Sequence, residues 1–235
     1  MSQRDSYRSG AVYGSAVNER ITFLRKTYTH LAGAIGLFVL FSYFFYASGV
    51  GLSILQMLQT SQFIWLLILG GFSLIGYMAQ SMARADNPLG KQYLGLGIYT
   101  LAEALIFSPL LLIAGHMYPH VLVDATIVTL AVFGGLTAYV LIYNKDFSFL
   151  GGFLCVAGFV ALAVIVVGVI FGFDLGVWFS GAMILFASMA ILYSTSKVLK
   201  YYRADQYVGA ALELFAAVAL LFWYVLRILM QLQRR

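Results

Sequence analysis

The sequence predicts an all-α integral membrane protein, built as a seven-transmembrane-helix bundle. Hydrophobic residues make up 62% of the 235 residues and charged residues only 10%, whereas soluble domains are about half apolar and a quarter charged. The mean hydropathy is +0.91, and apolar runs of about 20 residues, the length that crosses a bilayer, occupy nearly the whole chain. These runs lack the polar alternation of barrel strands, so we expect them to be helices.

The first three spans are expected at 27–47, 63–82 and 93–114. Residues 1–26 contain no apolar segment of the kind found in a secretory signal, so we expect them to form a cytoplasmic N-terminal tail. Glycines let helix backbones approach closely in lipid, and the second span carries Gly70, Gly71 and Gly76. The third span contains Pro109, whose missing N–H frees a backbone carbonyl and predicts a helix kink.

The last four spans are expected at 121–143, 149–171, 175–195 and 208–230, so that a transmembrane domain covers 27–230 and a short basic tail covers 231–235. Close packing is again predicted at Gly134, Gly135, Gly151, Gly152 and Gly158. Ahead of the fourth span, His116 and His120 are four residues apart, but Pro119 between them predicts a loop. A metal site is therefore left unassigned.

The distribution of Lys and Arg predicts the orientation of the chain. Connections that carry these residues alternate with connections that carry none, through the first six spans. Because Lys and Arg are enriched on the cytoplasmic side, we expect the N-terminus and the second, fourth and sixth connections in the cytoplasm. Seven full crossings would then place Arg234 and Arg235 outside, against the same rule, so an incomplete seventh crossing is an open alternative.

Several classes of function are disfavoured by the sequence. It contains no P-loop, no HExxH and no GxSxG motif, and its single cysteine excludes an intrachain disulfide or a cysteine metal cluster. The sequence therefore indicates neither an enzyme nor a cofactor. The formal charge is +5, but the basic residues lie singly between apolar runs rather than in a patch, which argues against a nucleic-acid partner and for the lipid bilayer.

Two acidic residues, Glu103 and Glu213, lie well inside predicted spans and are candidates for an ion pathway. A rise of about 1.5 Å per residue places Glu103 about 15 Å into its span, near the bilayer midplane, and Glu213 about 7 Å into the last span. An ionised carboxylate at mid-bilayer costs on the order of 3 kcal/mol. Such residues mark an ion path or a proton relay, or else a protonated carboxyl that is hydrogen-bonded to a neighbouring helix.

Five stretches of the chain resemble the transmembrane Bax inhibitor motif family of small seven-helix membrane proteins. They are FLRKTYTHLAG at 23–33, NPLGKQYLGLGIYTLAEALIFSPLLLIAG at 87–115, NKDFSFLGGFL at 144–154, ILYSTSK at 191–197 and ALELFAAVALLFWYVLRIL at 211–229. The resemblance implies a central last helix wrapped by the other six, and a pH-dependent leak of calcium through the membrane. It also implies partners: some bacterial members are associated with a membrane-bound ATP-dependent protease, and eukaryotic members with suppression of cell death.

Two positions depart from the pattern of this family. Members typically carry one aspartate in the sixth span and another in the last, and these two carboxyls together sense pH. Ser194 and Ala217 stand at these positions, and neither can titrate, so we expect pH gating to be altered or absent. Glu213 matches a second acidic position of some members, and Glu103 matches an acid that is common in their third span.

Two functions follow as alternatives. The first is a leak channel or transporter for calcium or another cation, with Glu103 and Glu213 lining the path. The second is a non-conducting interaction protein that regulates or accompanies another membrane complex, such as a membrane-bound protease. A calcium site uses six to eight oxygen ligands, and both aspartates that could supply some of them are missing. Their loss favours the second function. In either case we expect a multi-pass protein of a bacterial cell inner membrane.

Overall fold

Seven long helices and one short helix make up the part of the chain that the structure describes. It is a computed structural model that describes residues 17–61 and 63–234, so most of the predicted N-terminal tail and Arg235 lie outside the described residues. The helices are α2 (Val17–Ala47), α3 (Val50–Thr60), α4 (Phe63–Met82), α5 (Leu89–Met117), α6 (Pro119–Tyr143), α7 (Leu150–Phe171), α8 (Gly176–Lys200) and α9 (Tyr207–Gln233).

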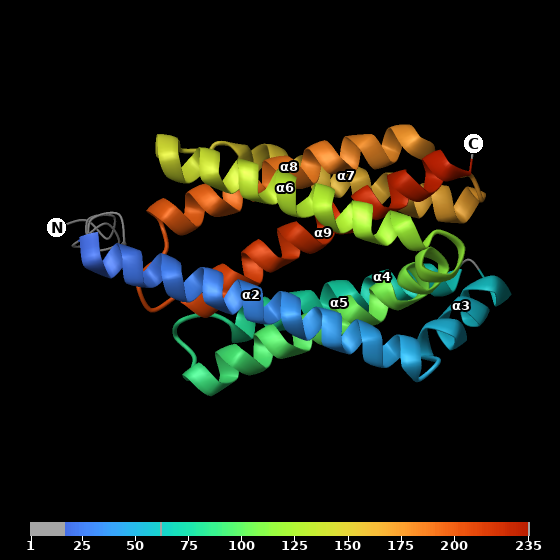
Figure 1. Cartoon of the computed structure of the whole chain (residues 1–235), viewed down its shortest axis with the longest axis horizontal. Helices are drawn as coiled ribbons and strands as arrows, with labels where there is room; N and C mark the ends of the chain where they lie inside the picture. The colour runs from blue at the N-terminus through green and yellow to red at the C-terminus, as the bar shows by residue number, and fades with distance from the viewer. Residues whose placement is uncertain (1–16, 62, 235) are drawn as a thin grey trace.

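Seven of the helices in the described residues, all except α3, are long and apolar enough to cross a bilayer, which confirms the predicted fold class. We call the end of the bundle where α2 begins its N-terminal end, and the end where α9 finishes its C-terminal end (Figure 1). Helix α9 has 27 residues and is therefore about 40 Å long at the usual rise. It crosses the bundle completely, so the alternative of an incomplete seventh crossing is wrong.

The short helix α3 was not predicted from the sequence. Its 11 residues span only about 16 Å, too little to cross a bilayer. A search for apolar windows of membrane length passes over such a segment. The helix lies at the C-terminal end of the bundle and packs against α2, α4 and α5 (Figure 1).

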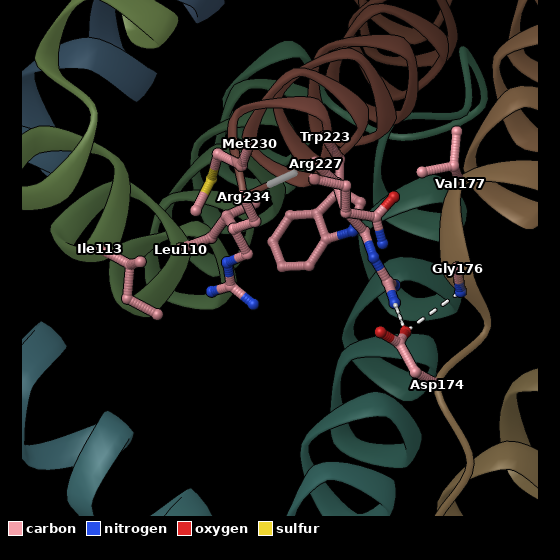
Figure 2. A pocket seen from close by; sticks show the side chains of 10 residues that line it. Leu110, Ile113, Asp174, Gly176, Val177, Trp223, Arg227, Met230 and Arg234 are labelled. Atoms are coloured by element: carbon pink, nitrogen blue, oxygen red, sulfur yellow. Dashed lines mark hydrogen bonds and ion pairs between the residues drawn. The ribbon is translucent and has the colours of Figure 1, made fainter.

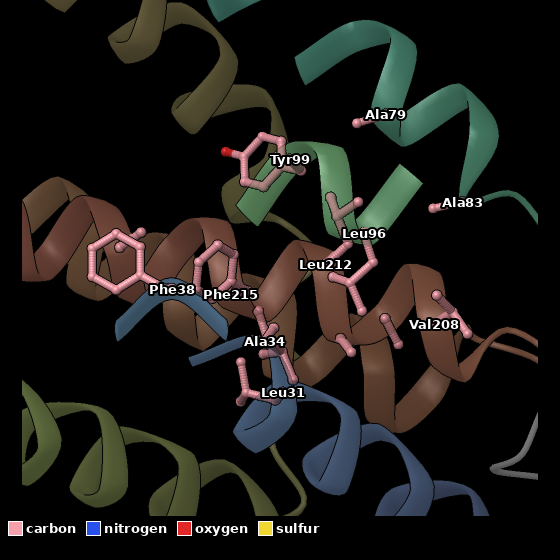
Figure 3. Close-up of a cluster of buried hydrophobic side chains, with 14 of the residues drawn as sticks. Leu31, Ala34, Phe38, Ala79, Ala83, Leu96, Tyr99, Val208, Leu212 and Phe215 are labelled. Atoms are coloured by element: carbon pink, nitrogen blue, oxygen red, sulfur yellow. The ribbon is translucent and has the colours of Figure 1, made fainter. Parts of the chain in front are cut away.

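Helix α9 is the centre of the bundle, as the family resemblance implies. It packs against α2, α5, α6 and α8, and 56% of its most apolar stretch is buried, against 6% for α7. Figure 3 shows part of this core, where Leu212 and Phe215 of α9 face Leu96 and Tyr99 of α5 and Phe38 of α2. Lipid is as apolar as these side chains, so close packing rather than water exclusion holds the helices together.

Glycine allows the closest helix contacts, but mostly at positions other than those predicted. A Cβ atom on Gly95 of α5 would lie 2.7 Å from the carbonyl oxygen of Ala79 in α4, and one on Gly209 of α9 would lie 2.9 Å from that of Ala83. The prediction of close packing is wrong where a Cβ would meet nothing within 4 Å: Gly70, Gly71, Gly134, Gly135 and Gly152. Glycine content alone does not show which face of a helix points inward.

Pro109 lies inside α5, and its effect on the hydrogen-bond ladder is compensated locally. Proline has no N–H, so the carbonyl of Leu105, four residues earlier, lacks its usual donor. The Ser108 hydroxyl donates to that carbonyl at 2.7 Å. The helix continues through Pro109 from Leu89 to Met117, and the kink that the sequence predicts here stays a prediction.

The orientation in the membrane can be tested by labelling. Cysteines substituted at Ser53 or His116, both exposed at the C-terminal end, are expected to react with a membrane-impermeant thiol reagent added outside the cell. The reason is the absence of Lys and Arg from the connections at that end. A Cys155→Ala background removes the native thiol, and Lys145→Cys at the N-terminal end is the matched position that should stay unlabelled. Labelling of Lys145→Cys instead of the other two would reverse the topology.

Candidate functional site

Glu213 is the centre of a polar cluster at the N-terminal end of the bundle. The loop between α8 and α9 turns the chain back on itself, so the second turn of α9 faces the last turns of α8. Lys197 donates to both carboxylate oxygens of Glu213, at 2.9 and 3.1 Å. The Ser194 hydroxyl donates to the same carboxylate at 3.2 Å, and Tyr202 donates through its hydroxyl. The Glu213 charge is therefore neutralised by an ion pair and held by two further donors.

Tyr202, in the loop between α8 and α9, acts as a donor at the pH of the cell. Burial, and next the negative charge of Glu213, raise the pKa of Tyr202 well above its ordinary value. The hydroxyl therefore keeps its proton and donates it in a hydrogen bond to the carboxylate.

A cavity of about 710 Å³ opens beside this cluster, and we call it the N-terminal cavity. Glu213, Lys197 and Tyr202 form one side of it, and the end of α4 forms the other. Arg84 and Asp86 line it as well, so charges of both signs face the space. Such a cavity can admit water and a small ion, but in this arrangement the carboxylate that would attract a cation already has a cationic partner.

A second polar network joins the connection between α6 and α7 to the end of α8. Asp146 accepts hydrogen bonds from the hydroxyls of Ser196 at 3.3 Å and Tyr201 at 2.9 Å, and it lies 3.9 Å from the Lys200 ammonium. The backbone N–H of Phe147 donates to Ser196 at 2.9 Å. Ser196 and Lys197 are adjacent, so the network ties the α6–α7 connection to the helix turn that holds Glu213.

The pKa of Asp146 reflects these contacts. Burial acts to raise the pKa, but hydrogen bonds from Ser148 and Tyr201 and the charge of Lys200 outweigh it, and the pKa lies below its usual value. A carboxyl whose pKa is lowered on folding stabilises the folded state above its unfolded pKa, about 3.9, and loses that contribution as the pH falls through the folded value.

An Asp146→Asn variant is therefore expected to be less stable than the parent at neutral pH, by less than about 1 kcal/mol, because the carboxylate is partly exposed. The difference should shrink as the pH falls below about 3.9 and through the lowered pKa of Asp146, because the carboxyl then takes up a proton and both proteins carry an uncharged group. Thermal unfolding in one detergent at both pH values measures this. Asp205→Asn, which removes a loop carboxylate that pairs with Arg203, is the control. A difference independent of pH would show that charge at Asp146 is not the cause.

Glu103 lies in a different environment from Glu213. Its side chain is almost fully buried in α5, with 7% of the residue exposed. The Tyr99 hydroxyl, one turn earlier on the same helix, hydrogen-bonds its carboxyl. Tyr99 itself packs edge-on against Phe215 of α9, with ring centroids 6.1 Å apart. The interactions found for Glu103 and Glu213 share no residue, so the structure does not join the two acids in one cluster.

The two positions where family members carry aspartate differ in their surroundings here. Ser194 is buried and bonds Glu213 directly. Ala217 lies one turn beyond Glu213 and is buried in an apolar cluster with Ala187 and Ile191 of α8. Ile191 is one turn before Ser194, so both positions belong to the interface between α8 and α9.

Sequence reasoning missed three residues of this site: Lys197, Tyr202 and Asp146. In the sequence, Lys197 is one of the basic residues whose distribution predicts the orientation. Lys197 is three residues after Ser194, so both side chains lie on one face of a helix. This spacing is the feature of the sequence that could have linked Lys197 to the site. Tyr202 and Asp146 lie in connections, where spacing along the chain does not show which side chains meet.

The chain is similar to the proteins of one known family. The profile of the family described as "Inhibitor of apoptosis-promoting Bax1" matches residues 20–234. An uncharacterized protein of Pseudomonas aeruginosa is 37% identical over 111 residues, 46% of this chain and about half, 49%, of that protein. Bax inhibitor 1 of Schizosaccharomyces pombe is 30% identical over 91% of this chain and 78% of its own length. Protein lifeguard 4 of Mus musculus is 29% identical over 96% of this chain and 92% of its own. No solved structure matches significantly.

Proposed function

This chain belongs to the Bax inhibitor family of multi-pass membrane proteins, and we propose that it is a leak channel or transporter for calcium or another cation with altered pH gating. Glu213 is the carboxylate that we assign to the cation path, and Glu103 is the second candidate. A cation leak requires an acidic group that ions can reach from water. Glu213 meets that requirement because it lines the N-terminal cavity.

The observation that carries the proposal is that the Glu213 carboxylate lines the N-terminal cavity, where it is paired with Lys197. The Lys197 ammonium sits where a free cation would be attracted, so it acts as a tethered cation. Conduction then requires Lys197 to move off the carboxylate. A pair of aspartates would instead respond to the loss of the proton that the two carboxyls share, and so to pH. We therefore expect different gating in this protein.

The location and domain boundaries complete the proposal. We place the protein in a bacterial inner membrane, which the similarity to a Pseudomonas protein supports. The N-terminal cavity then faces the cytoplasm, since the connections at that end carry Lys and Arg. Residues 1–26 and 231–235 are assigned as tails of a transmembrane domain at 27–230.

Calcium flux into liposomes that contain the purified chain tests this function. The parent should conduct above empty liposomes, and Glu213→Gln should reduce the flux, since glutamine keeps the size of the side chain and removes its charge. Asp205→Asn removes an exposed negative charge from the same end of the bundle and is the control for net charge. Equal flux in the parent and in empty liposomes would contradict the proposal.

A second function is favoured by one observation: the charge of Glu213 is already neutralised within the protein. A protein with this arrangement need not conduct, and would instead regulate or accompany another membrane complex, such as a membrane-bound protease. Purification in mild detergent separates the two functions. A stoichiometric partner retained by the parent, together with no flux, would support the interaction role.

The pH dependence of the flux is expected to be weak between about pH 6 and pH 8, because Ser194 and Ala217 do not titrate. Introducing both carboxyls, as Ser194→Asp with Ala217→Asp, should create a dependence on pH in that range, since two close carboxyls share a proton. Flux measured at several pH values, with each single substitution as control, checks this. A parent that is already steeply gated there would show that other groups sense pH.

A further inference from the structure

A second cavity, of about 410 Å³, lies at the opposite end of α9, and we call it the C-terminal cavity. Figure 2 shows it between the last turns of α9, the end of α5, and the residues that connect α7 to α8. It is distinct from the N-terminal cavity, and nothing in the proposed cation path uses it.

The charges at the C-terminal cavity are mainly positive. Arg227 lies in α9, Arg234, seven positions later, follows the last residue of that helix, and both line the cavity. Asp174 balances only the first: it lies 3.7 Å from the Arg227 guanidinium and also accepts the Gly176 N–H at 3.1 Å (Figure 2). Among the described residues, no ion pair is found for Arg234. The cavity therefore carries a surplus positive charge, which repels cations and attracts an anion.

The remaining wall is apolar. Leu110 and Ile113 of α5, Val177 of α8, and Trp223 and Met230 of α9 face the same space. A site that offers guanidinium groups on one side and hydrocarbon on the other suits an amphiphile better than a bare ion. The planar guanidinium of arginine can also donate two parallel hydrogen bonds to two oxygens of one phosphate group.

The depth of the two arginines agrees with this. Counting about 1.5 Å per residue from Tyr207, Arg227 lies about 30 Å and Arg234 about 40 Å along α9. The hydrocarbon core is about 30 Å thick, so Arg227 is at its far edge and Arg234 is at the level of the headgroups. Positive residues are disfavoured on the non-cytoplasmic side that we propose for this end, and a bound anion gives them a role there.

We propose that the C-terminal cavity binds a phosphate-bearing anion, with Arg234 and Arg227 on the phosphate group. The apolar wall favours the headgroup of an anionic phospholipid as the source of that group, with the start of an acyl chain against Leu110 and Ile113. Free phosphate is the other source of the same chemistry. Asp174 acts by holding the Arg227 guanidinium in place.

Native mass spectrometry of the full chain in a neutral detergent tests the proposal, with phosphatidylglycerol, phosphatidylcholine and inorganic phosphate as probes. The parent should bind phosphatidylglycerol in preference to phosphatidylcholine. Arg234→Gln should weaken binding of phosphatidylglycerol by about tenfold, the loss expected for one charge-assisted contact, and leave phosphatidylcholine unchanged. Arg234 is exposed at the end of the helix, so this variant is expected to fold.

Two comparisons complete the experiment. Arg203→Gln removes an exposed charge at the other end of the bundle and should not change lipid binding. Displacement of phosphatidylglycerol by inorganic phosphate would identify free phosphate as the ligand of the same site, and a lack of displacement would identify the lipid. The proposal is overturned if both lipids bind alike, or if Arg203→Gln and Arg234→Gln weaken binding equally.

Discussion

Replacing Lys197 with methionine is expected to raise the calcium flux by about tenfold. The substitution removes the ammonium that lies 2.9 Å from the Glu213 carboxylate and keeps a flexible side chain of similar length. A charged hydrogen bond contributes about 1.5–3 kcal/mol, and about 1.4 kcal/mol less in a barrier increases a rate tenfold. Ser194 and Tyr202 still hold the carboxylate in place, so a cation can take the position that Lys197 leaves.

The same liposome assay, with two controls, measures this effect. Lys145→Met makes the same chemical change in an exposed loop at that end of the bundle, and its flux should equal that of the parent. Lys197→Met combined with Glu213→Gln should lose the increase, because the attracting carboxylate is gone. If Lys197→Met conducts no better than the parent, Lys197 is a structural partner only and the tethered-cation explanation is wrong.

Glu103→Leu is expected to lower the free energy of unfolding by about 1–3 kcal/mol, the cost of leaving a buried polar group without its partner. The group left is the Tyr99 hydroxyl, because Tyr99 is almost fully buried beside Glu103. Glu103→Gln keeps the volume and an acceptor oxygen, so this variant should unfold close to the parent. If Glu103 lines the cation path, as we propose, flux through Glu103→Gln should fall by roughly tenfold.

Thermal unfolding in one detergent and liposome flux, measured on both variants, distinguish the two roles of Glu103. A loss of flux in Glu103→Gln without a loss of stability supports the path. Unchanged flux in Glu103→Gln with low stability in Glu103→Leu supports a purely structural acid. Tyr99→Phe removes the hydroxyl from the same pair and should restore part of the stability of Glu103→Leu. If both variants match the parent in both assays, the assignment of Glu103 is wrong.

The fold was largely predictable because the bilayer restricts what the chain can do. A segment that crosses lipid must satisfy its own backbone and reach a fixed length, so seven apolar runs define seven helices. The observed helix ends differ from the predicted span ends where a helix continues into polar residues. Helix α8, for example, extends to Lys200 and so includes Lys197. Helix α3 was not predicted because it is too short to cross the membrane. The length and hydrophobicity that a bilayer requires of a spanning helix therefore do not apply to it.

The candidate site was less predictable, because its contacts join different elements. Glu213 stood out in the sequence as an acid in an apolar run. Its partner Lys197 did not, because a lysine at the end of a span has an ordinary explanation as a marker of orientation. The spacing of Ser194 and Lys197 fixes which helix face they share, but only the packing of α8 on α9 shows what that face contacts.

The central position of α9 has a consequence for biosynthesis. The ribosome makes the six surrounding helices before the helix on which four of them pack. Thr100 of α5 and Thr129 of α6 are buried in the complete bundle. Until α9 enters the membrane, these two helices lack the helix against which both of them pack. Membrane-inserted chains that end before Tyr207 are therefore expected to remain loosely associated and to be degraded, even though each of their helices can insert. In this protein the last of the described helices to be translated completes the tertiary structure.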